Sequence, residues 1–321
     1  MTAPLVSIGM PVYNGALYLR QALDSLLAQS YSSFEIFIAD NGSTDSTPAI
    51  CTEYARRDPR IVYHRHATPV HVIENFNSTL RAAKGNYFMW AAHDDLWDPE
   101  FIATLTTLLE QNPAAVLAFS HFDNIDALGH PIRQFRTAWG EMFSGPKVRQ
   151  LCRFALADRN LDQPANYIYG LFRTSALRER HGFEALGSCV YGCDYVTLFH
   201  LLMTGEFAVT ERILFHYRFG HRDTAGVAGL PHLPAMAKRL RRHSQRYFRF
   251  LRENRMMFER CGKYVRRAPL GPAQRGVLQA TLTYAEIASV ILCTYRSVAA
   301  DFARPASRIS PVAARVESQV E

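Results

Sequence analysis

Two adjacent carboxylates, Asp94 and Asp95, follow the apolar run at residues 87–91. Like charges this close repel each other, so acids paired at the end of a strand need a compensating positive charge. A divalent cation can supply it, because Mg²⁺ and Mn²⁺ prefer carboxylate oxygens together with phosphate oxygens. The pair therefore predicts a site that binds a metal and a nucleotide diphosphate together.

A structural alternative is that these acids only mark the beginning of the next helix, where the helix dipole favours negative charge. However, the segment Asp98-Pro99-Glu100 already supplies a helix start, with proline at the first helical position. We therefore expect Asp98 to belong to the cap of that helix, and Asp94 and Asp95 to be available for chemistry.

The elements that position these acids alternate between strands and helices over the first 120 residues. Strands are expected at 6–12, 34–39, 61–65, 87–91 and 115–119, with helices between them. This alternation predicts a parallel, doubly wound α/β sheet, in which ligands bind outside the carboxyl ends of the strands. Asn14, Asp40 and Asp94 fall at strand ends, so we expect them to converge on one crevice.

After residue 121 the alternation is lost. We expect a hairpin turn at 126–129, strands at 167–173 and 207–218, a helix at 190–204 and an almost wholly helical segment at 235–300. The predicted organisation is a catalytic domain at 1–230, with a nucleotide-binding half (1–120) and an acceptor-binding half (121–230). A basic helical extension (231–300) and a flexible tail (301–321) follow it.

Several sequence blocks carry a family resemblance. Residues 5–14 and 34–47 contain the pattern P-x-Y-N followed by D-[DN]-G-S-x-D, and further matches lie at 83–87, 93–100, 170–173 and 192–195. These blocks resemble the family-2 inverting glycosyltransferases of GT-A fold, over roughly residues 4–222. The resemblance implies a mixed, mostly parallel central sheet with flanking helices. It also implies transfer of a sugar from a nucleotide diphosphate sugar to an acceptor, with inversion at the anomeric carbon.

The resemblance assigns donor-binding roles to Pro11, Tyr13, Asn14, Asp40, Asp94 and His221, and makes Asp95 the ligand of a Mn²⁺ or Mg²⁺ ion. Tyr13 can stack on a pyrimidine ring, although an aromatic that merely caps the sheet is the simpler interpretation of that residue alone. Asp40 can accept the ring N–H of uracil or thymine. Its alternative role, capping the next turn, suits Asp45 better, because Asp45 directly precedes a Ser-Thr-Pro helix start.

The acidic motif departs from the family pattern at one position. The usual D-x-D-D run has Ala92 where its first aspartate would stand. By resemblance Asp95 ligates the metal, while Asp94 contacts the ribose or reaches the metal through water. The departure bears on the metal affinity and on the division of work between these two acids.

An inverting transfer also needs a base that takes the proton of the acceptor hydroxyl. Because a single displacement suffices, no covalent nucleophile is required. Asp194 matches the family's base position, and Cys193 replaces the acid that often precedes it; a helix N-cap is the structural alternative for Asp194. The segment 216–224 resembles the loop that closes over the donor, where Arg218, His221 or Arg222 would meet the diphosphate.

The chain's net charge of +7 is concentrated in one segment. Residues 238–267 contain twelve Lys or Arg and two Glu, a net charge of +10. Interleaved aromatic and apolar residues allow three interpretations: an amphipathic helix on an anionic bilayer, a solvated helix face, or a nucleic-acid patch. Nucleic acid ranks last because no base-stacking module is recognisable. Peripheral membrane contact would suit a lipid-linked glycan as acceptor.

Targeting features and alternative functions complete the prediction. No apolar run is long enough for a membrane-spanning helix, and no signal peptide is recognisable, so we expect a cytoplasmic protein, at the inner face of the membrane if the basic segment binds lipid. A UDP- or dTDP-linked donor and a role in surface polysaccharide synthesis are expected. The alternatives are a catalytically impaired nucleotide-sugar-binding protein and a nucleotidyltransferase. A dehydrogenase is disfavoured because no G-x-G-x-x-G follows a strand.

Overall fold

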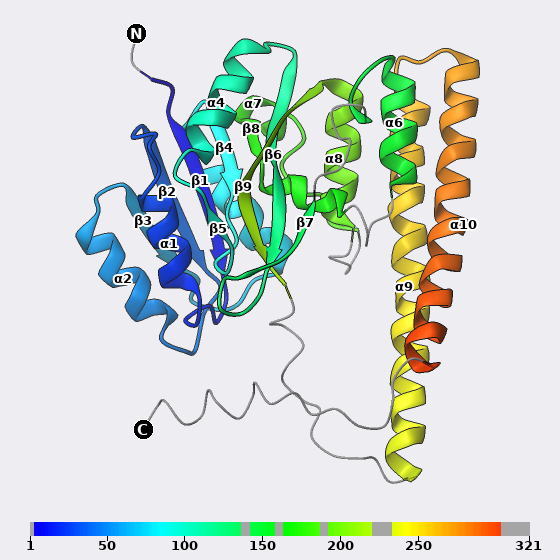
Figure 1. Cartoon of the computed structure of the whole chain (residues 1–321), viewed down its shortest axis with the longest axis horizontal. Coiled ribbons are helices and arrows are strands. Elements are labelled where there is room, and N and C mark those ends of the chain that lie inside the picture. Colours follow the sequence, from blue (N-terminus) through cyan, green and yellow to red (C-terminus); the bar gives the residue numbers. More distant parts are fainter. Residues whose placement is uncertain (1–2, 136–141, 158–162, 187–191, 220–232, 303–321) are drawn as a thin grey trace.

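The computed structural model describes residues 3–135, 142–157, 163–186, 192–219 and 233–302. A nine-stranded sheet forms its centre (Figure 1). The strands are β1 (Val6–Val12), β2 (Phe34–Asp40), β3 (Ile61–Arg65), β4 (Tyr87–Trp90), β5 (Leu96–Trp97), β6 (Ala115–Ile125), β7 (Pro131–Phe135), β8 (Leu171–Arg173) and β9 (Glu206–Arg218).

The sheet is mixed and mostly parallel, with the strand order β3-β2-β1-β4-β8-β6-β9-β5 and β7 paired to β6. The first four strands in this order are parallel, and so are β6 and β9. The short strand β8 runs antiparallel between β4 and β6. The turn between β6 and β7 is closed by a 2.9 Å hydrogen bond from the N–H of Asp126 to the carbonyl of His130. The predicted fold class and the hairpin turn are confirmed.

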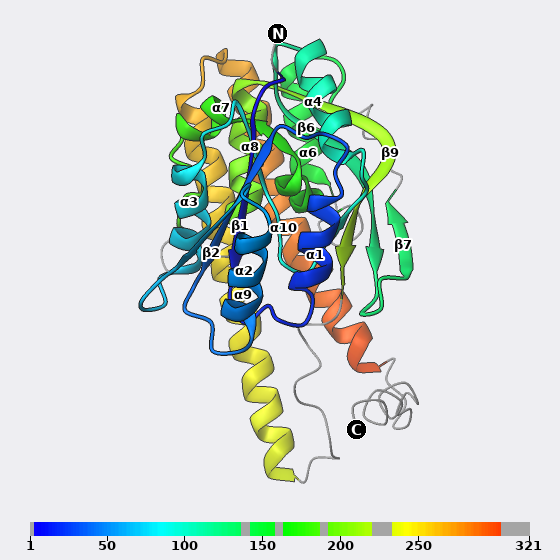
Figure 2. The ribbon, with the colours of Figure 1, turned by 90° about the vertical axis from the view of Figure 1, so that its left-hand side faces the viewer.

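Helices flank the sheet. They are α1 (Leu19–Leu27), α2 (Thr47–Arg57), α3 (Val72–Ala82), α4 (Phe101–Gln111), α6 (Lys147–Leu156), α7 (Thr174–Arg178), α8 (Cys193–Thr204), α9 (Leu233–Arg267) and α10 (Pro272–Phe302), with a 3₁₀ helix η1 at Pro164–Tyr169. Figure 2 shows α1 and α2 in front of the sheet and the long helices α9 and α10 behind it. Among the described residues, none of the helices combines the length and the apolar character that crossing a bilayer requires.

The central strands are buried because helices cover them. All seven residues of β1 are buried. On α1 the residues at helical spacing that face the sheet, Leu19, Leu23 and Leu26, are also fully buried. A strand covered on both faces reads as a continuous apolar run, which is why β1 is easily recognised in the sequence.

The two C-terminal helices share the core of the sheet domain. Met257 and Cys261 of α9 and Leu278 of α10 are fully buried and belong to the same continuous apolar cluster as the strands. The two helices confirm the helical prediction for 235–300. Because they share this apolar cluster, α9 and α10 form a helical layer of the sheet domain (Figure 1).

Two predicted strands differ in extent. In the segment predicted as a strand at 167–173, residues up to Tyr169 form η1, and only Leu171–Arg173 pairs with the sheet. The ring of Tyr167 stacks on Phe119 with 4.0 Å between centroids, so packing in the core outweighs the local β-propensity of this segment. Strand β6 extends six residues beyond the predicted end at 119, because its polar residues up to Asn124 are buried within the sheet domain.

Candidate active site

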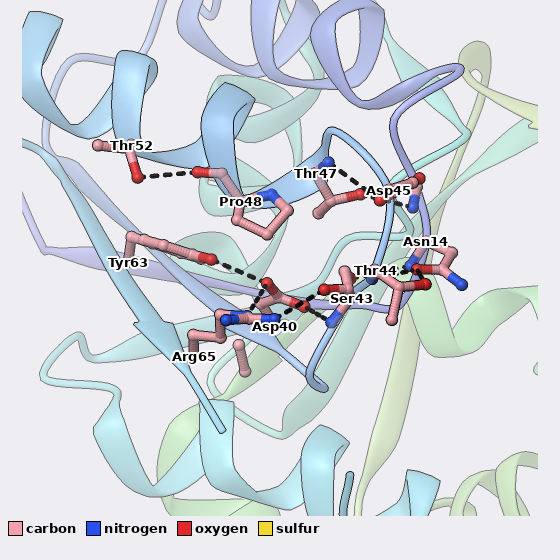
Figure 3. A network of polar contacts seen from close by, with 12 residues as sticks. Asn14, Asp40, Ser43, Thr44, Asp45, Thr47, Pro48, Thr52, Tyr63 and Arg65 are labelled. Carbon is pink, nitrogen blue, oxygen red and sulfur yellow. Dashed lines mark hydrogen bonds and ion pairs between the residues drawn. The ribbon is translucent and has the colours of Figure 1, made fainter. Parts of the chain in front are cut away.

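The loops that follow β1 and β2 bind each other through polar contacts (Figure 3). Asn14 has a positive φ of 51°, a left-handed conformation that asparagine tolerates better than most residues. Its Oδ1 accepts the N–H of Thr44 at 2.8 Å, and its own N–H donates to Ser43 Oγ at 2.9 Å. The turn after β1 is thereby held in place by the turn after β2.

Asp40 ends β2 and is fully buried. Its Oδ1 accepts the N–H of Ser43 at 2.8 Å, and its Oδ2 accepts the hydroxyl of Tyr63 at 2.8 Å and lies 3.5 Å from Arg65 Nε. Burial, and then the hydrogen bond and charge of Asp40, raise the pKa of Tyr63. These contacts hold the carboxylate of Asp40 in place at the end of β2. The ring N–H of a bound nucleotide base would share the same carboxylate oxygens.

Asp45 closes the same network at the beginning of α2. Its Oδ1 accepts the N–H of Thr47 at 3.0 Å, and its Oδ2 accepts the N–H of Ala16 at 3.1 Å. Burial opposes the charged form, but the hydrogen bonds from Thr47 and Ala16 outweigh it and lower the pKa of Asp45. The prediction that Asp45 caps the turn before α2 is confirmed.

Tyr13 and Pro11 of the first motif differ in their exposure to solvent. Tyr13 directly follows β1 and is 52% exposed. Pro11 is buried inside β1, paired with Ala39 of β2. Direct contact of Tyr13 and Pro11 with a donor remains a prediction.

Asp94 and Asp95 lie just beyond β4 and are 2% and 0% exposed. The N–H of Arg218, the last residue of β9, donates to Asp95 Oδ1 at 2.8 Å. Arg218 Nε donates to the backbone carbonyl of Asp94 at 2.7 Å. The end of β9 therefore holds both acids, across 123 positions of sequence.

The guanidinium of Arg218 is itself a buried crosslink. Its Nη1 donates to the carbonyls of Asp126 and Ala127 at 2.9 and 3.0 Å, and its Nη2 donates to Gln21 Oε1 at 2.9 Å. The group also lies 4.3 Å from the ring centroid of Tyr18. Nε and both Nη atoms therefore donate to protein acceptors, so the guanidinium has a structural role. This corrects the sequence-based expectation that Arg218 could meet a diphosphate.

A second polar group near the acids went unrecognised in the sequence. His216 Nδ1 lies 2.6 Å from Asp123 Oδ1, and its Nε2 lies 3.1 Å from Asp98 Oδ1. Burial alone would lower the pKa of His216, but the hydrogen bonds and charges of the two carboxylates outweigh it and raise that pKa. The triad links β5, β6 and β9. Long-range pairing brings these residues together, and no local pattern signals it.

The same contact corrects the prediction for Asp98. Helix α4 begins at Phe101 with Glu100 at its N-cap, and the side chain of Glu100 makes no capping hydrogen bond. Gln29 caps the first turn instead, because its Oε1 accepts the N–H of Ile102 at 3.0 Å. The carboxylate of Asp98 faces His216 instead, because β5 pairs with β9 and places Leu96 opposite His216. Asp98 contributes to the helix start only through its carbonyl, which accepts the N–H of Phe101 at 3.0 Å.

Asp194 is half-buried in the first turn of α8. Its Oδ1 accepts the N–H of Tyr195 at 2.7 Å. Gly192, just before it, has a φ of +79°, and a Cβ there would lie 2.6 Å from Met257 Sδ of α9. The start of α8 faces the same lower side of Figure 1 as the ends of β1, β2 and β9. Helix α9 thus packs directly against the turn that carries Asp194.

Two residues of the predicted site, His221 and Arg222, lie at 220–232, outside the described residues. Among the residues that the structure does describe, no cluster of three or more His, Cys, Asp or Glu could hold a metal by itself. Nucleotide-bound Mg²⁺, however, needs only one or two carboxylates, since phosphates and water complete its shell. The adjacent acids Asp94 and Asp95 fit that donor set.

The larger of two prominent surface pockets lies elsewhere. It encloses about 710 Å³ and is lined by Lys84, Tyr87, Arg173 and neighbouring residues. These residues stand at the amino ends of β4 and its neighbours, the sheet edge opposite to Asp40 and Asp95. In an open α/β sheet the ligand crevice is at the carboxyl ends, so we assign the candidate site to Asp40 and Asp95 rather than to this pocket.

Comparison with known proteins indicates the family and the fold. The model of the family described as glycosyl transferase family 2 matches residues 7–173. An uncharacterized glycosyltransferase of Rickettsia typhi is 35% identical over 131 residues, which cover 40% of this chain and 40% of the relative. The match thus spans less than half the length of that relative.

Two solved structures share the fold. S. aureus TarS 1-349 in complex with UDP-GlcNAc superimposes with a TM-score of 0.61 at 15% identity, covering 88% of this chain and 72% of that one. The mannosyltransferase PcManGT from Pyrobaculum calidifontis, in complex with GDP-Man and Mn²⁺, gives a TM-score of 0.58 at 16% identity, with coverage of 99% and 79%. At this identity the likeness establishes the fold.

Proposed function

Since the chain belongs to glycosyl transferase family 2, we propose that it is an inverting enzyme that uses a UDP- or dTDP-linked sugar. The acceptor would be a hydroxyl group of a glycan or of a lipid-linked glycan, in the synthesis of a surface polysaccharide. The observation that carries the proposal is the convergence of Asn14, Asp40, Asp94 and Asp95 at the carboxyl ends of parallel strands. Polar turns at that edge suit a nucleotide diphosphate, and the acids suit a divalent cation bound to its phosphates.

The donor would lie along the rim formed by the first two loops. Tyr13 would stack on the pyrimidine, and Asp40 would accept the ring N–H while keeping its bonds to Ser43 and Tyr63. Asp94 would contact the ribose. A Mn²⁺ or Mg²⁺ ion held by Asp95 would neutralise charge on the leaving diphosphate. His221 remains assigned to the donor on sequence grounds.

Asp194 would act as the general base. Its carboxylate accepts the proton of the acceptor hydroxyl as that oxygen attacks the anomeric carbon. The new glycosidic bond forms while the bond from the anomeric carbon to the phosphate oxygen breaks, and the nucleoside diphosphate leaves with the electron pair. The half-exposed position of Asp194 in the first turn of α8 is compatible with this role, because the group is accessible yet fixed by helix packing.

Calorimetric titration of UDP, dTDP and GDP, with and without Mn²⁺, tests the donor site. We expect a pyrimidine diphosphate to bind the wild type in a metal-dependent manner and to lose that dependence in Asp95→Ala. Glu53→Gln, which removes an exposed carboxylate paired with Arg20, is the matched control and should bind like the wild type. Equal, metal-independent binding in all three proteins would contradict the role given to Asp95.

Hydrolysis of a nucleotide sugar separates an enzyme from a mere binder. With Mn²⁺ present, the wild type should release UDP slowly from its donor, and Asp194→Asn should reduce that release about 10²- to 10⁴-fold while UDP affinity is retained. A wild type that binds the nucleotide sugar but never turns it over, with any acceptor offered, would favour the catalytically impaired binding protein. The basis of that alternative is Ala92, which stands where the family pattern has its first aspartate.

A further inference from the structure

Helix α10 exposes an apolar stripe. Val277, Tyr284, Ile287 and Ile291 are 53%, 65%, 54% and 62% exposed. Their spacing of three, four and seven residues places them along one side of the helix. Between residues 276 and 292 the only charged residue is Glu286. The core does not account for this stripe, because Leu278 and Leu282, on the other side of α10, already supply the buried contacts.

Helix α9 exposes a basic stripe beside it. Within residues 248–267 the exposed cations are Arg249, Arg252, Arg255, Lys263, Arg266 and Arg267, and the one exposed carboxylate is Glu259. Two members of the set are paired with carboxylates, Arg249 with Glu253 at 2.7 Å and Arg255 with Glu259 at 2.8 Å. The remaining four cations still leave an excess of positive charge on this face. A helix face with this excess of positive charge attracts an anionic surface.

The two stripes face outward together. The helices are neighbours, since Gln279 Nε2 donates to the carbonyl of Gly262 at 2.8 Å. Each helix buries its other side in the same core, through residues such as Met257 and Leu278. We define the hairpin face as the exposed residues of 248–267 and 276–292. A surface with an apolar ridge beside a cationic ridge is typical of helices that lie in a bilayer interface.

Helix α9, which carries part of the hairpin face, also packs against the turn before Asp194. Its buried side does so, because Met257 contacts the turn at Gly192, two residues before Asp194. In Figure 1 the N-terminal part of α9 extends below the body, on the same side as the carboxyl ends of β1 and β2. Helix α9 therefore links the hairpin face to the turn that carries Asp194.

We propose that the hairpin face docks on an anionic lipid bilayer. Tyr284, Ile287 and Ile291 enter the interface, while the basic stripe contacts lipid phosphates. Charge complementarity favours this occupant over a second copy of the chain, because two hairpin faces brought together would oppose their cations. If the proposed function holds, docking would present a lipid-linked acceptor to Asp194.

Vesicle flotation of the full chain tests the proposal. The vesicles are made of phosphatidylcholine alone or of phosphatidylcholine mixed with phosphatidylglycerol. We expect binding to the mixed vesicles, weakened by salt, and little binding to the neutral ones. The double variant Arg252→Gln/Lys263→Gln should bind about thirtyfold more weakly, since each cation near an anionic surface contributes about a fivefold gain. Arg56→Gln/Arg57→Gln on α2 is the matched charge control.

A second variant tests the apolar ridge. Ile287→Ser/Ile291→Ser should lower binding to the mixed vesicles on the order of tenfold or more, because it removes apolar groups from the interface. Ile132→Ser on β7, where the side chain is 58% exposed, is the matched control and should change binding less than about twofold. All four variants are at exposed positions, so folding should be preserved.

Three results would overturn the proposal: no binding of the wild type to mixed vesicles at low salt, equal loss in Ile132→Ser, or a wild-type dimer in light scattering that Ile287→Ser/Ile291→Ser converts to monomer. The last result would assign the face to a second copy of the chain. UDP titration without vesicles keeps the two proposals distinct. Vesicle binding without any nucleotide binding would leave docking intact and refute the donor site.

Discussion

The two sides of the candidate crevice are held by different kinds of interaction. On the proposed donor side, hydrogen bonds connect Asn14, Asp40 and Asp45 to loop residues within about thirty positions of sequence. On the proposed acceptor side, Asp194 follows a glycine turn that packs against Met257 of α9. One side is a short-range polar network, and the other depends on the docking of a distant helix.

This difference has a consequence for function. A polar network within two neighbouring loops is formed whenever β1 and β2 pair, so the donor rim is largely complete within the sheet itself. The acceptor side is complete only when α9 is docked on α8. We therefore expect a displacement of α9 to affect Asp194 more than the donor rim.

The largest effect is expected from Arg218, which connects Asp94 and Asp95 to α1 and to the β6–β7 turn. Replacing it with methionine would leave the carbonyls of Asp126 and Ala127 and the amide of Gln21 without a donor. Because each buried group left unsatisfied costs about 1–3 kcal/mol, Arg218→Met should lower the free energy of unfolding by on the order of 3 kcal/mol or more.

Urea denaturation measures that loss. Arg212→Met on the same strand is the control, because Arg212 is an exposed partner of Glu100 and such pairs contribute below about 1 kcal/mol. Equal losses in the two variants would show that Arg218 does not crosslink the crevice.

Next in size is the acceptor side alone, tested by Gly192→Ala. The residue has a φ of +79°, and its new Cβ would lie 2.6 Å from Met257 Sδ. A left-handed conformation costs a non-glycine residue about 1–2 kcal/mol, and a small displacement of a catalytic group costs up to about 10²-fold in rate. We expect nucleotide-sugar turnover to fall on the order of tenfold to a hundredfold, with UDP affinity unchanged.

Gly276→Ala is the control for that substitution. Nothing lies within 4 Å of a Cβ at Gly276 in α10, so alanine should stabilise the helix by about 0.5–1 kcal/mol and leave turnover as it is. A parallel loss of UDP affinity in Gly192→Ala would break the separation between the two sides.

The donor side alone is tested by Asn14→Ala. Alanine loses the bond to Thr44 and tolerates the φ of 51° less well, so we expect a loss of about 1–2 kcal/mol in stability and a several-fold loss in UDP affinity. Asn14→Gly is the informative partner, because glycine accepts the backbone conformation and removes only the side-chain bonds. If glycine restores UDP affinity, the conformation matters more than the amide.

The sequence predicts the donor side better than the acceptor side for the same physical reason. Strand ends and the turns after them are local features, so the local pattern places Asn14 and Asp40 at strand ends and predicts the cap by Asp45, while the resemblance supplies the donor-binding roles. The sheet of the first 100 residues follows from alternating apolar patterns, which local periodicity records.

Local sequence patterns do not predict interactions between distant segments. Asp98 looked like a helix cap because of the proline after it, yet pairing of β5 with β9 directs its carboxylate to His216. The resemblance places Arg218 among the residues that would meet the diphosphate, and only the fold reveals that four backbone or side-chain oxygens accept hydrogen bonds from its guanidinium. Likewise the apolar stripe of α10 is visible in the sequence, but its exposure is not.

The smallest effects are expected in the pH dependence of stability. One histidine on each side has a shifted pKa, and the two shifts have opposite directions. His216, beside the donor-side acids, has a raised pKa, because Asp98 and Asp123 outweigh the effect of burial. His200, on α8 and stacked on Tyr264 of α9 at 3.9 Å, has its pKa lowered to about 4, first by burial and then by Arg180.

The signs follow from linkage. For His216 the folded pKa exceeds the unfolded value of about 6.5, so its stabilisation is fully present below pH 6.5 and is lost as the pH rises through the folded pKa. For His200 the folded pKa is the lower one, so stability is present above about pH 6.5 and is lost as the pH falls toward 4.

Urea midpoints measured across this range should therefore move apart in two variants. His216→Gln should remove part of the stability at about pH 6 and little of it well above neutrality, where the wild type has lost the charge. His200→Phe, which keeps an aromatic ring against Tyr264, should flatten the loss of stability between about pH 6.5 and 4. Because both groups are partly solvated, each effect should stay near or below about 1 kcal/mol. Identical pH profiles in the two variants would contradict the opposite pKa shifts of His216 and His200.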